Sequence, residues 1–351
     1  MHLDFLTAEI MASFVGMCGR ISSHNSFKED IMDIREGNCI GELKKIAIES
    51  VQTIYLDPPF NSNHNYVLEV GSDIGFADKW TDEAYEAFIE SVITECARCL
   101  AKDGSLFFHI SADQMFIPQT VLRKHFKFVR PIFWKRCRSK NNVKKTLGSA
   151  IDVLFWCYHS EKRKFAMVFQ PRDQYYVEHS FKNKDDRGNY SFGHLVPDRT
   201  RTGHVYPFTI NGRTFAPERG WRFPLNELQA LADDNRLHVP TGKKANLYKK
   251  IYLNEGEGKP CMDLWDDIAS IAQGTEERKY PTAKPVKLLE RIIAMTTSEG
   301  DTVLDPMAGS GTTGEACRNL KRKAILIDLN PQAIAIMQER LISVIQRITV
   351  L

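Results

Sequence analysis

Short runs of β-branched and aromatic residues alternate with stretches of helical periodicity along the first half of the chain. The clearest strands are expected at residues 53–56, 105–110, 128–134 and 153–158. A helix is predicted over residues 81–100, because Thr81-Asp82-Glu83 supplies an N-cap and acidic first-turn residues. Asp103-Gly104 is expected to turn the chain into the next strand. This alternation predicts an α/β fold built around one sheet.

After about residue 160 the pattern changes to polar, loop-rich segments in which glycine and proline interrupt every long run. Regular patterning resumes near Pro285, with helices expected at residues 286–296 and 314–320 and strands at 302–304 and 324–328. The sheet is therefore predicted to be divided in the sequence around an insert. We accordingly divide the chain into residues 1–160, 161–280 and 281–351.

Composition narrows the class of protein. A chain of 351 residues with 43% hydrophobic and 26% charged residues is ordinary for a globular protein, and its length favours one large domain with a smaller insert. No apolar stretch is long enough to span a bilayer, and the N-terminus has no basic region ahead of an apolar one. The eight scattered cysteines fit a reducing compartment, so we expect free thiols and a cytoplasmic location. The C-x-x-C pair, Cys96 and Cys99, is expected on a packed helix face, with no metal site.

Charge is unevenly distributed, although the net charge is only +3. Between Gln114 and Ile151 there are ten Lys or Arg residues and no Asp or Glu. Such a segment is typical either of a solvated face or of a surface that contacts a phosphate backbone, and the pattern alone does not decide between them.

A glycine-rich turn follows the predicted strand 302–304. It opens a helix and contains Asp305, Met307, Ala308, Gly309, Ser310, Gly311, Thr312 and Thr313. Glycines let the backbone bend sharply and approach a ligand, and the free amides of a helix N-terminus favour an anionic group. Asp328 closes the next strand, where a carboxylate can accept both hydroxyls of a ribose. A nucleotide site is predicted, but the nucleotide stays open, because a nicotinamide-dependent oxidoreductase uses similar elements.

A second motif, Asp57-Pro58-Pro59-Phe60, follows the strand predicted at 53–56, at the end where open α/β sheets bind ligands. The two prolines fix the backbone and leave nearby carbonyls as acceptors. One interpretation is a plain turn. In the functional interpretation, Asp57 and the Pro58 carbonyl accept the two hydrogens of an aromatic amine, so that its lone pair faces a sulfonium methyl group while Phe60 stacks on the base.

Taken together, residues 57–60 and 305–313 resemble the amino-methyltransferases that modify adenine N6 or cytosine N4 in DNA. Their order is similar to the beta-class arrangement, in which the methyltransferase sheet is circularly permuted. The resemblance implies a Rossmann-like mixed sheet, S-adenosylmethionine as cofactor and direct displacement on a flipped base. It makes residues 1–160 the catalytic half, 161–280 the target-recognition region and 281–351 the cofactor-binding half.

Other segments are similar to the family in register. Residues 281–285 and 288–293 match the segment beside the cofactor's methionine end, which adds Lys284 and Pro285 to the implied cofactor site, together with the turn and Asp328. Residues 264–268 resemble a stretch found in adenine-specific members. The chain also departs from the family, with Asn38 where Asp is usual, Ala283 where Gln is commoner and Asp328 where Glu is usual.

Double-stranded DNA is the partner that the resemblance implies, and the insert is expected to read it. Arg219, Trp221 and Arg222 combine guanidinium groups with an aromatic ring, although a packed loop anchored by Trp221 is the alternative. Lys243 and Lys244 are expected to contact the DNA backbone. In the catalytic half, the residues expected to hold the strand are Lys135, Arg136, Arg138 and Lys140.

Four other functions compete with this one. A cytosine-C5 enzyme needs a nucleophilic cysteine, and Cys261 stands in the wrong order and context. Cytosine-N4 transfer shares the amine chemistry, and only Asp57 favours adenine, since Ser is commoner in that position for cytosine. An oxidoreductase leaves residues 57–60 unexplained, and a non-catalytic nucleic-acid-binding module leaves both loops unexplained. A membrane partner is not expected; a homodimer and a cognate restriction endonuclease stay open.

Overall fold

The computed structural model describes residues 32–67, 75–137, 147–199, 204–242, 246–271 and 283–348. These residues form two compact units. The larger unit ends its first segment at Val168 and resumes at Cys261, and the smaller unit is Phe169–Pro260. The smaller unit is narrower than the predicted insert 161–280. The flanks belong to the larger unit because the backbone amide of Ala166 donates to Met295 and that of Cys261 donates to Val168.

The larger unit alternates strands and helices as the hydrophobic pattern predicts. Its elements are β1 (Met32–Glu36), α3 (Cys39–Leu43), β2 (Val51–Leu56), β3 (His64–Val67), β4 (Gly75–Asp78), α4 (Asp82–Cys99), β5 (Leu100–Ser111), η1 (Ala112–Gln114), α5 (Phe116–His125), β6 (Phe128–Lys135), β7 (Ile151–Tyr158), β16 (Leu264–Trp265), α8 (Val286–Thr296), β17 (Thr302–Asp305), α9 (Thr312–Asn319), β18 (Lys323–Asp328) and α10 (Pro331–Ile348). The N-cap of α4 is Thr81, whose side chain accepts a hydrogen bond from the Ala84 amide.

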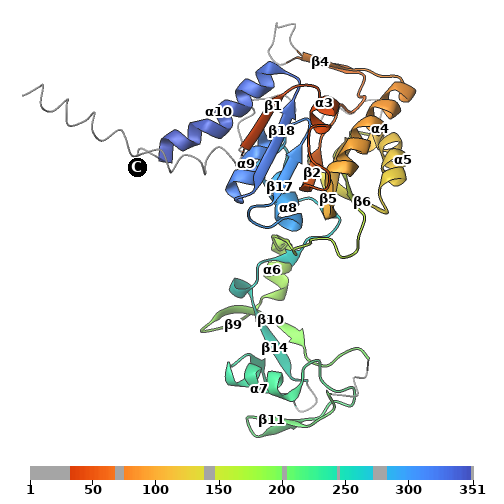
Figure 1. The fold of residues 1–351 in the computed structure, drawn as a ribbon. Helices are drawn as coiled ribbons and strands as arrows, with labels where there is room; N and C mark the ends of the chain where they lie inside the picture. Colours follow the sequence, from red (N-terminus) through yellow and green to blue (C-terminus); the bar gives the residue numbers. More distant parts are fainter. Residues whose placement is uncertain are drawn as a thin grey trace, which may run out of the picture. The chain divides into compact units, whose positions relative to one another are not determined.

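Eight strands form one mixed sheet in the order β1-β18-β17-β2-β5-β7-β6-β16. The first five are mutually parallel, whereas β7 runs antiparallel to both β5 and β6. The predicted α/β fold is therefore confirmed. Strand β17, late in the sequence, pairs with β2, early in the sequence, so the turns that follow these two strands lie at the same edge of the sheet (Figure 1).

One prediction within the sheet is wrong. Asp103-Gly104 does not turn the chain into a strand, because β5 runs through both residues from Leu100 to Ser111. The pairing register with β2 shifts there, between Val51 and Thr53. A Cβ atom on Gly104 would lie 2.9 Å from the Gln52 carbonyl oxygen, so the glycine permits β2 and β5 to approach closely. The sequence alone suggests a turn at this glycine.

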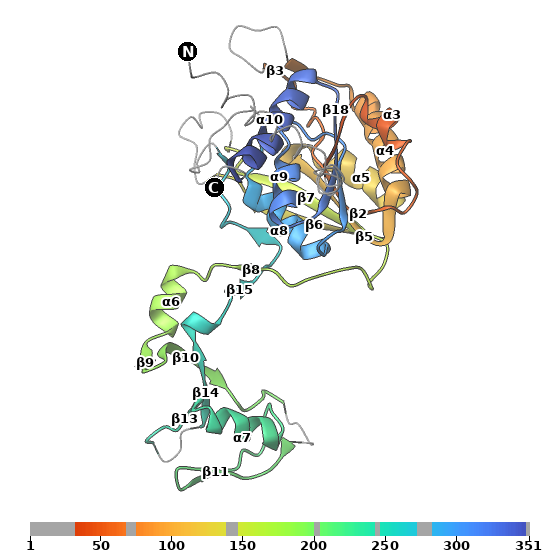
Figure 2. The ribbon, with the colours of Figure 1, turned by 60° about the vertical axis from the view of Figure 1, so that its left-hand side comes forward.

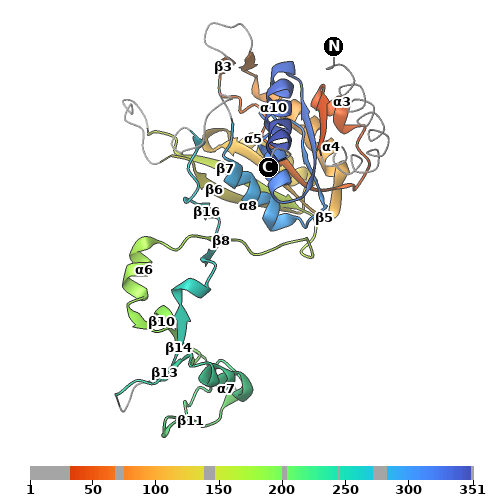
Figure 3. The same ribbon diagram turned by 90° about the vertical axis from the view of Figure 1, so that its left-hand side faces the viewer.

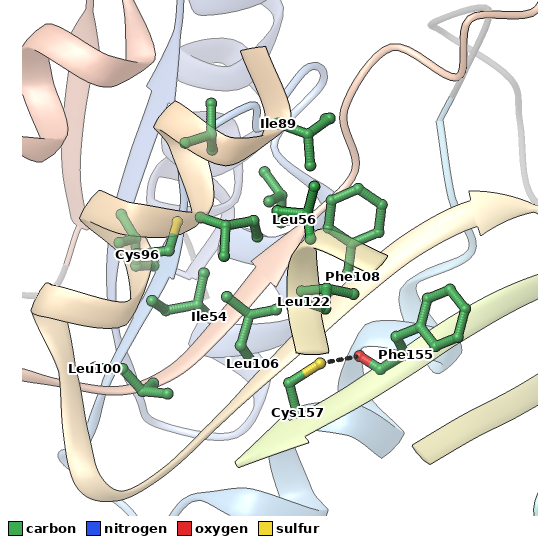
Figure 4. Close-up of a cluster of buried hydrophobic side chains, with 14 of the residues drawn as sticks. Ile54, Leu56, Ile89, Cys96, Leu100, Leu106, Phe108, Leu122, Phe155 and Cys157 are labelled. Atoms are coloured by element: carbon green, nitrogen blue, oxygen red, sulfur yellow. Dashed lines mark hydrogen bonds between the residues drawn. The ribbon is translucent and has the colours of Figure 1, made fainter. Parts of the chain in front are cut away.

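Two hydrophobic cores lie on opposite faces of the sheet. Figures 1 and 2 show α4 and α5 on one side of it and α8, α9 and α10 on the other. On the first side, Leu56 and Phe108 of the sheet pack against α4 and α5 through Ile89 and Leu122 (Figure 4). Cys96 and Cys99 are buried in this region, which confirms the packed helix face. The helices cover both faces of the sheet and leave the carboxyl ends of its strands uncovered by helices.

The smaller unit has its own core. Its elements, green in Figure 3, are β8 (Phe169–Gln170), α6 (Gln174–Ser180), β9 (Asn183–Asp185), β10 (Gly188–His194), β11 (Phe208–Ile210), β12 (Arg213–Phe215), α7 (Leu225–Asp233), β13 (Leu237–His238), β14 (Tyr248–Tyr252), η3 (Leu253–Glu255) and β15 (Lys259–Pro260). Strands β13, β14, β10 and β9 form an antiparallel sheet.

Within the parts of the chain described, no helix has the length and apolar character needed to cross a membrane.

Candidate functional site

The two sequence motifs meet at the carboxyl edge of the parallel strands. Asp57 directly follows β2, and Asp305 ends the neighbouring strand β17. The charge on Asp57 contributes to the raised pKa of Asp305, although burial contributes more, so the two carboxyl groups interact electrostatically. A loop predicted to activate an amine and a loop predicted to hold a nucleotide therefore adjoin.

The two carboxylate oxygens of Asp57 have different surroundings. Oδ2 accepts a hydrogen bond from Nζ of Lys284, which comes from the segment before α8. Oδ1 is buried and has no hydrogen-bond partner among the described residues. Since buried polar atoms are normally paired, this oxygen is free to accept a hydrogen bond from a bound ligand.

The predicted catalytic loop, residues 57–60, is held by a residue that sequence reasoning missed. Asp78, the buried last residue of β4, accepts hydrogen bonds from the amides of Phe60 (3.2 Å), Asn61 (2.7 Å) and Ser62 (2.9 Å) and from the Ser62 hydroxyl (2.6 Å). It fixes the backbone immediately after the two prolines. The sequence carries no signal for this contact, because Asp78 lies 17 positions after Asn61 and belongs to no recognisable motif.

The Pro59 carbonyl is also occupied by a neighbour. The hydroxyl of Tyr85 on α4 donates to it at 2.8 Å. Phe60 is half-buried against the core, and its ring lies 5.7 Å from that of His109, while Nζ of Lys284 lies 5.5 Å from the Phe60 ring centre. The Pro59 carbonyl thus anchors the loop, and none of the described contacts involves the carbonyl of Pro58.

A network of buried polar side chains extends from Asp57 into the sheet. His109 of β5 is fully buried; its Nδ1 is 2.7 Å from the Tyr55 hydroxyl and 3.7 Å from Oδ1 of Asp57. Its Nε2 is 3.3 Å from Oδ2 of Asp152, and Nε of Arg136 is 3.0 Å from the other oxygen of Asp152. Burial opposes the charged form of Asp152, but the hydrogen bond to His109 and the charge of Arg136 hold its pKa below the ordinary value. Sequence reasoning missed His109, Asp152 and Tyr55.

The glycine-rich turn is organised by its own carboxylates. Asp305 accepts from the Thr313 hydroxyl at 2.5 Å and from the Met307 amide at 3.1 Å. Complete burial raises the pKa of Asp305 to about 7, against these two hydrogen bonds. Gly311 adopts φ 76°, a left-handed conformation that favours glycine, and caps α9.

Asp328 holds the same turn from the neighbouring strand. Its Oδ2 accepts from the Gly309 amide and its Oδ1 from the Asn330 amide, each at 2.8 Å. Burial raises its pKa, whereas these amides oppose the rise. The side chain is half-buried, and each oxygen keeps acceptor capacity, so the position suits a ribose hydroxyl.

The remaining residues predicted to bind the cofactor are occupied by contacts within the fold. Asn38 caps the short helix α3 by accepting from the amides of Ile40 and Gly41. Pro285 precedes the first turn of α8 and is buried, and Ala308 is buried in the turn. The hydroxyls of Ser310 and Thr312 point inward to Arg340 of α10, at 3.1 and 3.0 Å.

The turn fits a nucleoside cofactor in three respects. Gly309 and Gly311 place backbone without side chains at the end of β17, where a ligand can approach closely. Asp328 offers carboxylate oxygens that can accept from the ribose hydroxyls. Asp57 follows β2, the strand paired with β17, so the loop predicted to activate the amine adjoins the turn. No group of three or more His, Cys, Asp or Glu side chains in the described segments could hold a metal ion.

The residues predicted to bind DNA are scattered. Lys135 is exposed, but Arg136 turns inward to Asp152, which lies below the catalytic loop. Trp221 is 1% exposed and packs in the core of the smaller unit, so the packed-loop alternative accounts for it and the direct DNA contact predicted for its ring is wrong. Arg219 and Arg222 are exposed. Four predicted residues lie outside the described residues: Arg138, Lys140, Lys243 and Lys244.

Comparison with known proteins identifies the family. A family model described as DNA methylase, for N6 and N4 methyltransferases, matches residues 51–339. That range contains both loops and the smaller unit, and the chain belongs to this family. The resemblance to DNA amino-methyltransferases is thereby confirmed.

Individual relatives are distant. The chain is 27% identical over 316 residues to "DNA adenine methyltransferase YhdJ" of Escherichia coli (strain K12), covering 90% of this chain and 84% of that protein. It is 24% identical over 293 residues to "Type II methyltransferase M.EcaI" of Enterobacter cloacae, covering 82% of this chain and 64% of that protein, which is less than two thirds of its length. The solved structure of the PvuII DNA methyltransferase (cytosine-N4-specific) has a TM-score of 0.50 at 15% identity, covers 91% of this chain and 92% of its own, and shows the fold alone.

Proposed function

We propose that this member of the DNA methylase family transfers a methyl group from S-adenosylmethionine to N6 of an adenine flipped out of DNA. The observation that carries the proposal is the buried Oδ1 of Asp57, which has no hydrogen-bond partner among the described residues and lies beside the glycine-rich turn. A free acceptor at that position can bind the amine that is to be methylated.

The chemistry follows from how the catalytic loop presents acceptors. An aromatic amine is a poor nucleophile because its lone pair is delocalised into the ring. Asp57 Oδ1 and the Pro58 carbonyl would accept its two hydrogens and favour a pyramidal nitrogen whose lone pair is available. Phe60 would stack on the extruded base. Lys284 fixes the other oxygen of Asp57, and Asp78 fixes the backbone of the loop, so the geometry is preorganised.

S-adenosylmethionine supplies the electrophilic methyl group on a positively charged sulfur. The glycine-rich turn, from Asp305 to Thr313, would hold it, with Asp328 on the ribose and Asn38, Lys284 and Pro285 around it. In this structure the Lys284 ammonium also binds Asp57, so the same side chain can serve both the cofactor site and the catalytic loop.

The smaller unit is proposed as the target-recognition region, and Lys135, Arg219 and Arg222 are proposed contacts to DNA. Two observations support this. The unit has its own sheet and core, as an independent recognition module requires, and these three cationic side chains are exposed. Guanidinium groups suit both base edges and phosphates.

Adenine is favoured over cytosine by one residue and one relative. Asp57 begins the catalytic loop, where the adenine-specific pattern has Asp, and the chain covers most of a relative named a DNA adenine methyltransferase. The fold does not discriminate, since the matching solved structure is named cytosine-N4-specific. Cytosine N4 is the second candidate, and the beta-class order stays a prediction.

The deciding experiment incubates the protein with tritiated S-adenosylmethionine and unmethylated DNA, then identifies the modified nucleoside by mass spectrometry. We expect N6-methyladenine, and a loss of at least about a thousandfold in rate for Asp57→Ala, because the variant lacks the amine acceptor. Asp113→Ala, an exposed carboxylate after β5, is the matched control and should keep full activity. Only 4-methylcytosine in the product, or an active Asp57→Ala enzyme, would contradict the proposal.

A further inference from the structure

His109 occupies an unusual position for a titratable side chain. It is fully buried in β5, one strand away from Asp57, and contacts polar groups on both sides of its ring. Phe60 and Trp134 pack against the ring, with centroids 5.7 and 5.6 Å away. These apolar contacts exclude water, so any proton exchanged by His109 must pass through its polar neighbours.

The neighbours determine how the imidazole is protonated. Asp152, ion-paired with Arg136, can only accept from Nε2, so Nε2 carries the hydrogen in the neutral ring. Nδ1 is then an acceptor, and the Tyr55 hydroxyl donates to it at 2.7 Å. Burial raises the pKa of Tyr55 well above its ordinary value, so the hydroxyl keeps its own proton. Nδ1 is the ring nitrogen that faces Oδ1 of Asp57, at 3.7 Å.

We propose that His109 receives, through the Asp57 carboxylate, the proton that the amine loses on methylation. This inference rests on the proposed function. His109 does not touch the substrate; it acts through Asp57. Of the two side chains that contact the Asp57 carboxylate, the Lys284 ammonium only donates, whereas His109 has a ring nitrogen that can accept a proton.

The step balances in atoms and charge. The amine nitrogen forms a bond to the methyl carbon, the sulfur keeps the electron pair of the broken bond, and the nitrogen is left with one hydrogen too many. That proton moves to Oδ1 of Asp57 and on to Nδ1 of His109, while the hydrogen of the Tyr55 hydroxyl rotates away from Nδ1 and leaves the hydroxyl oxygen as an acceptor. The positive charge lost from sulfur is replaced by an imidazolium next to the Asp152 carboxylate, so the buried site ends with the same net charge.

The charged and titratable groups that face His109 come from two strands and one loop: Tyr55 of β2, Asp57 in the loop after β2, and Asp152 of β7. Lys284 and Arg136 act on it through their carboxylate partners. Because a His109 ring that is already protonated cannot accept a second proton, the methylation rate should fall at low pH.

The test measures single-turnover methylation of DNA between about pH 5.5 and 8.5, the range in which histidine ordinarily titrates. Because the raised pKa of Asp305, about 7, lies in the same range, the profile of Asp305→Asn is measured beside that of His109→Gln. His109→Gln keeps hydrogen-bonding capacity but cannot hold a proton. We expect its rate to fall about a hundredfold at neutral pH and the acid limb of the profile to disappear. A lower rate with the acid limb unchanged would assign His109 a purely structural role and overturn the proposal.

A second variant guards against misfolding of the first. Asp152→Asn removes the anion that stabilises the imidazolium, so the acid limb should move to lower pH; an unmoved limb contradicts the proposal. His125→Gln, at the end of α5 and outside this network, is the control and should match the wild type. If the wild type fails to methylate DNA, the proposed function fails; if it methylates and His109→Gln keeps its rate and profile, only this inference fails.

Discussion

The turns after β2 and β17 are neighbours, yet they are stabilised in opposite ways. The glycine-rich turn is held by carboxylates at strand ends, Asp305 and Asp328, whose oxygens all accept hydrogen bonds from the turn or from the residues beside it. The catalytic loop is held from outside, by Asp78 and Lys284, and its own carboxylate keeps one oxygen free. The difference suits their proposed roles: one turn cradles a ligand with its backbone, while the other exposes a side-chain acceptor.

External support has a consequence for mutation. The glycine-rich turn packs as part of the fold, so a substitution within it should lower the stability of the protein. The catalytic loop is held by side chains outside it, so the loss of one of them should change the geometry of the loop while the fold survives. Three substitutions test this contrast.

The largest effect is expected for Asp78→Ala. The variant removes the acceptor for the amides of Phe60, Asn61 and Ser62, so the backbone after the two prolines is no longer held in position. We expect the methylation rate to fall about a hundredfold, since an error of about 1 Å in placement costs that much. Affinity for S-adenosylmethionine, measured by calorimetry, should change less than about threefold. A parallel loss of affinity would show that the two turns are not independently supported.

Gly311→Ala should act on stability. A Cβ atom there would lie 2.5 Å from Cγ of Met337, and the backbone has φ 76°. Strain and crowding together should lower the free energy of unfolding by about 2–3 kcal/mol, seen as a lower Tm. Gly300→Ala is the matched control, because Gly300 has φ 82° but a Cβ atom there would meet nothing within 4 Å, so it reports backbone strain alone. Equal losses in both variants would rule out a contribution from Met337.

The smallest effect concerns pH. Burial raises the pKa of Asp305 to about 7, so between its unfolded value and about 7 the folded protein holds a proton that the unfolded chain does not. Stability should therefore fall as the pH rises through this range, by at most about 1.4 kcal/mol per pH unit from this group. Asp305→Asn should remove that slope, which thermal melts from about pH 5 to 8 would detect. Identical pH slopes in the two proteins would show that Asp305 ionises normally.

Much of the site can be located from the sequence because its determinants are local. Helix 286–296 and the strands that precede both motifs follow from periodicity, and two prolines or two glycines in fixed spacing restrict the backbone wherever they occur. Asp57 and Asp305 are predictable on that basis. The order of the motifs also indicates that distant strands are adjacent.

Other features depend on contacts between residues far apart in the chain. Arg136, predicted to face DNA, instead pairs with Asp152, and Trp221 is buried, because periodicity does not reveal which partner a polar or aromatic residue will meet. Asp103-Gly104 has the composition of a turn, yet strand pairing extends through it.

The sequence by itself determined the family motifs, their order and the α/β alternation, since each depends on residues within a few positions of one another. Only the tertiary structure decided which side chains surround Asp57. Lys284 reaches it across 227 positions of sequence, and His109 reaches it from another strand. Such contacts arise because strand pairing and burial bring distant polar groups together, where an unpaired group is costly and a partner is required.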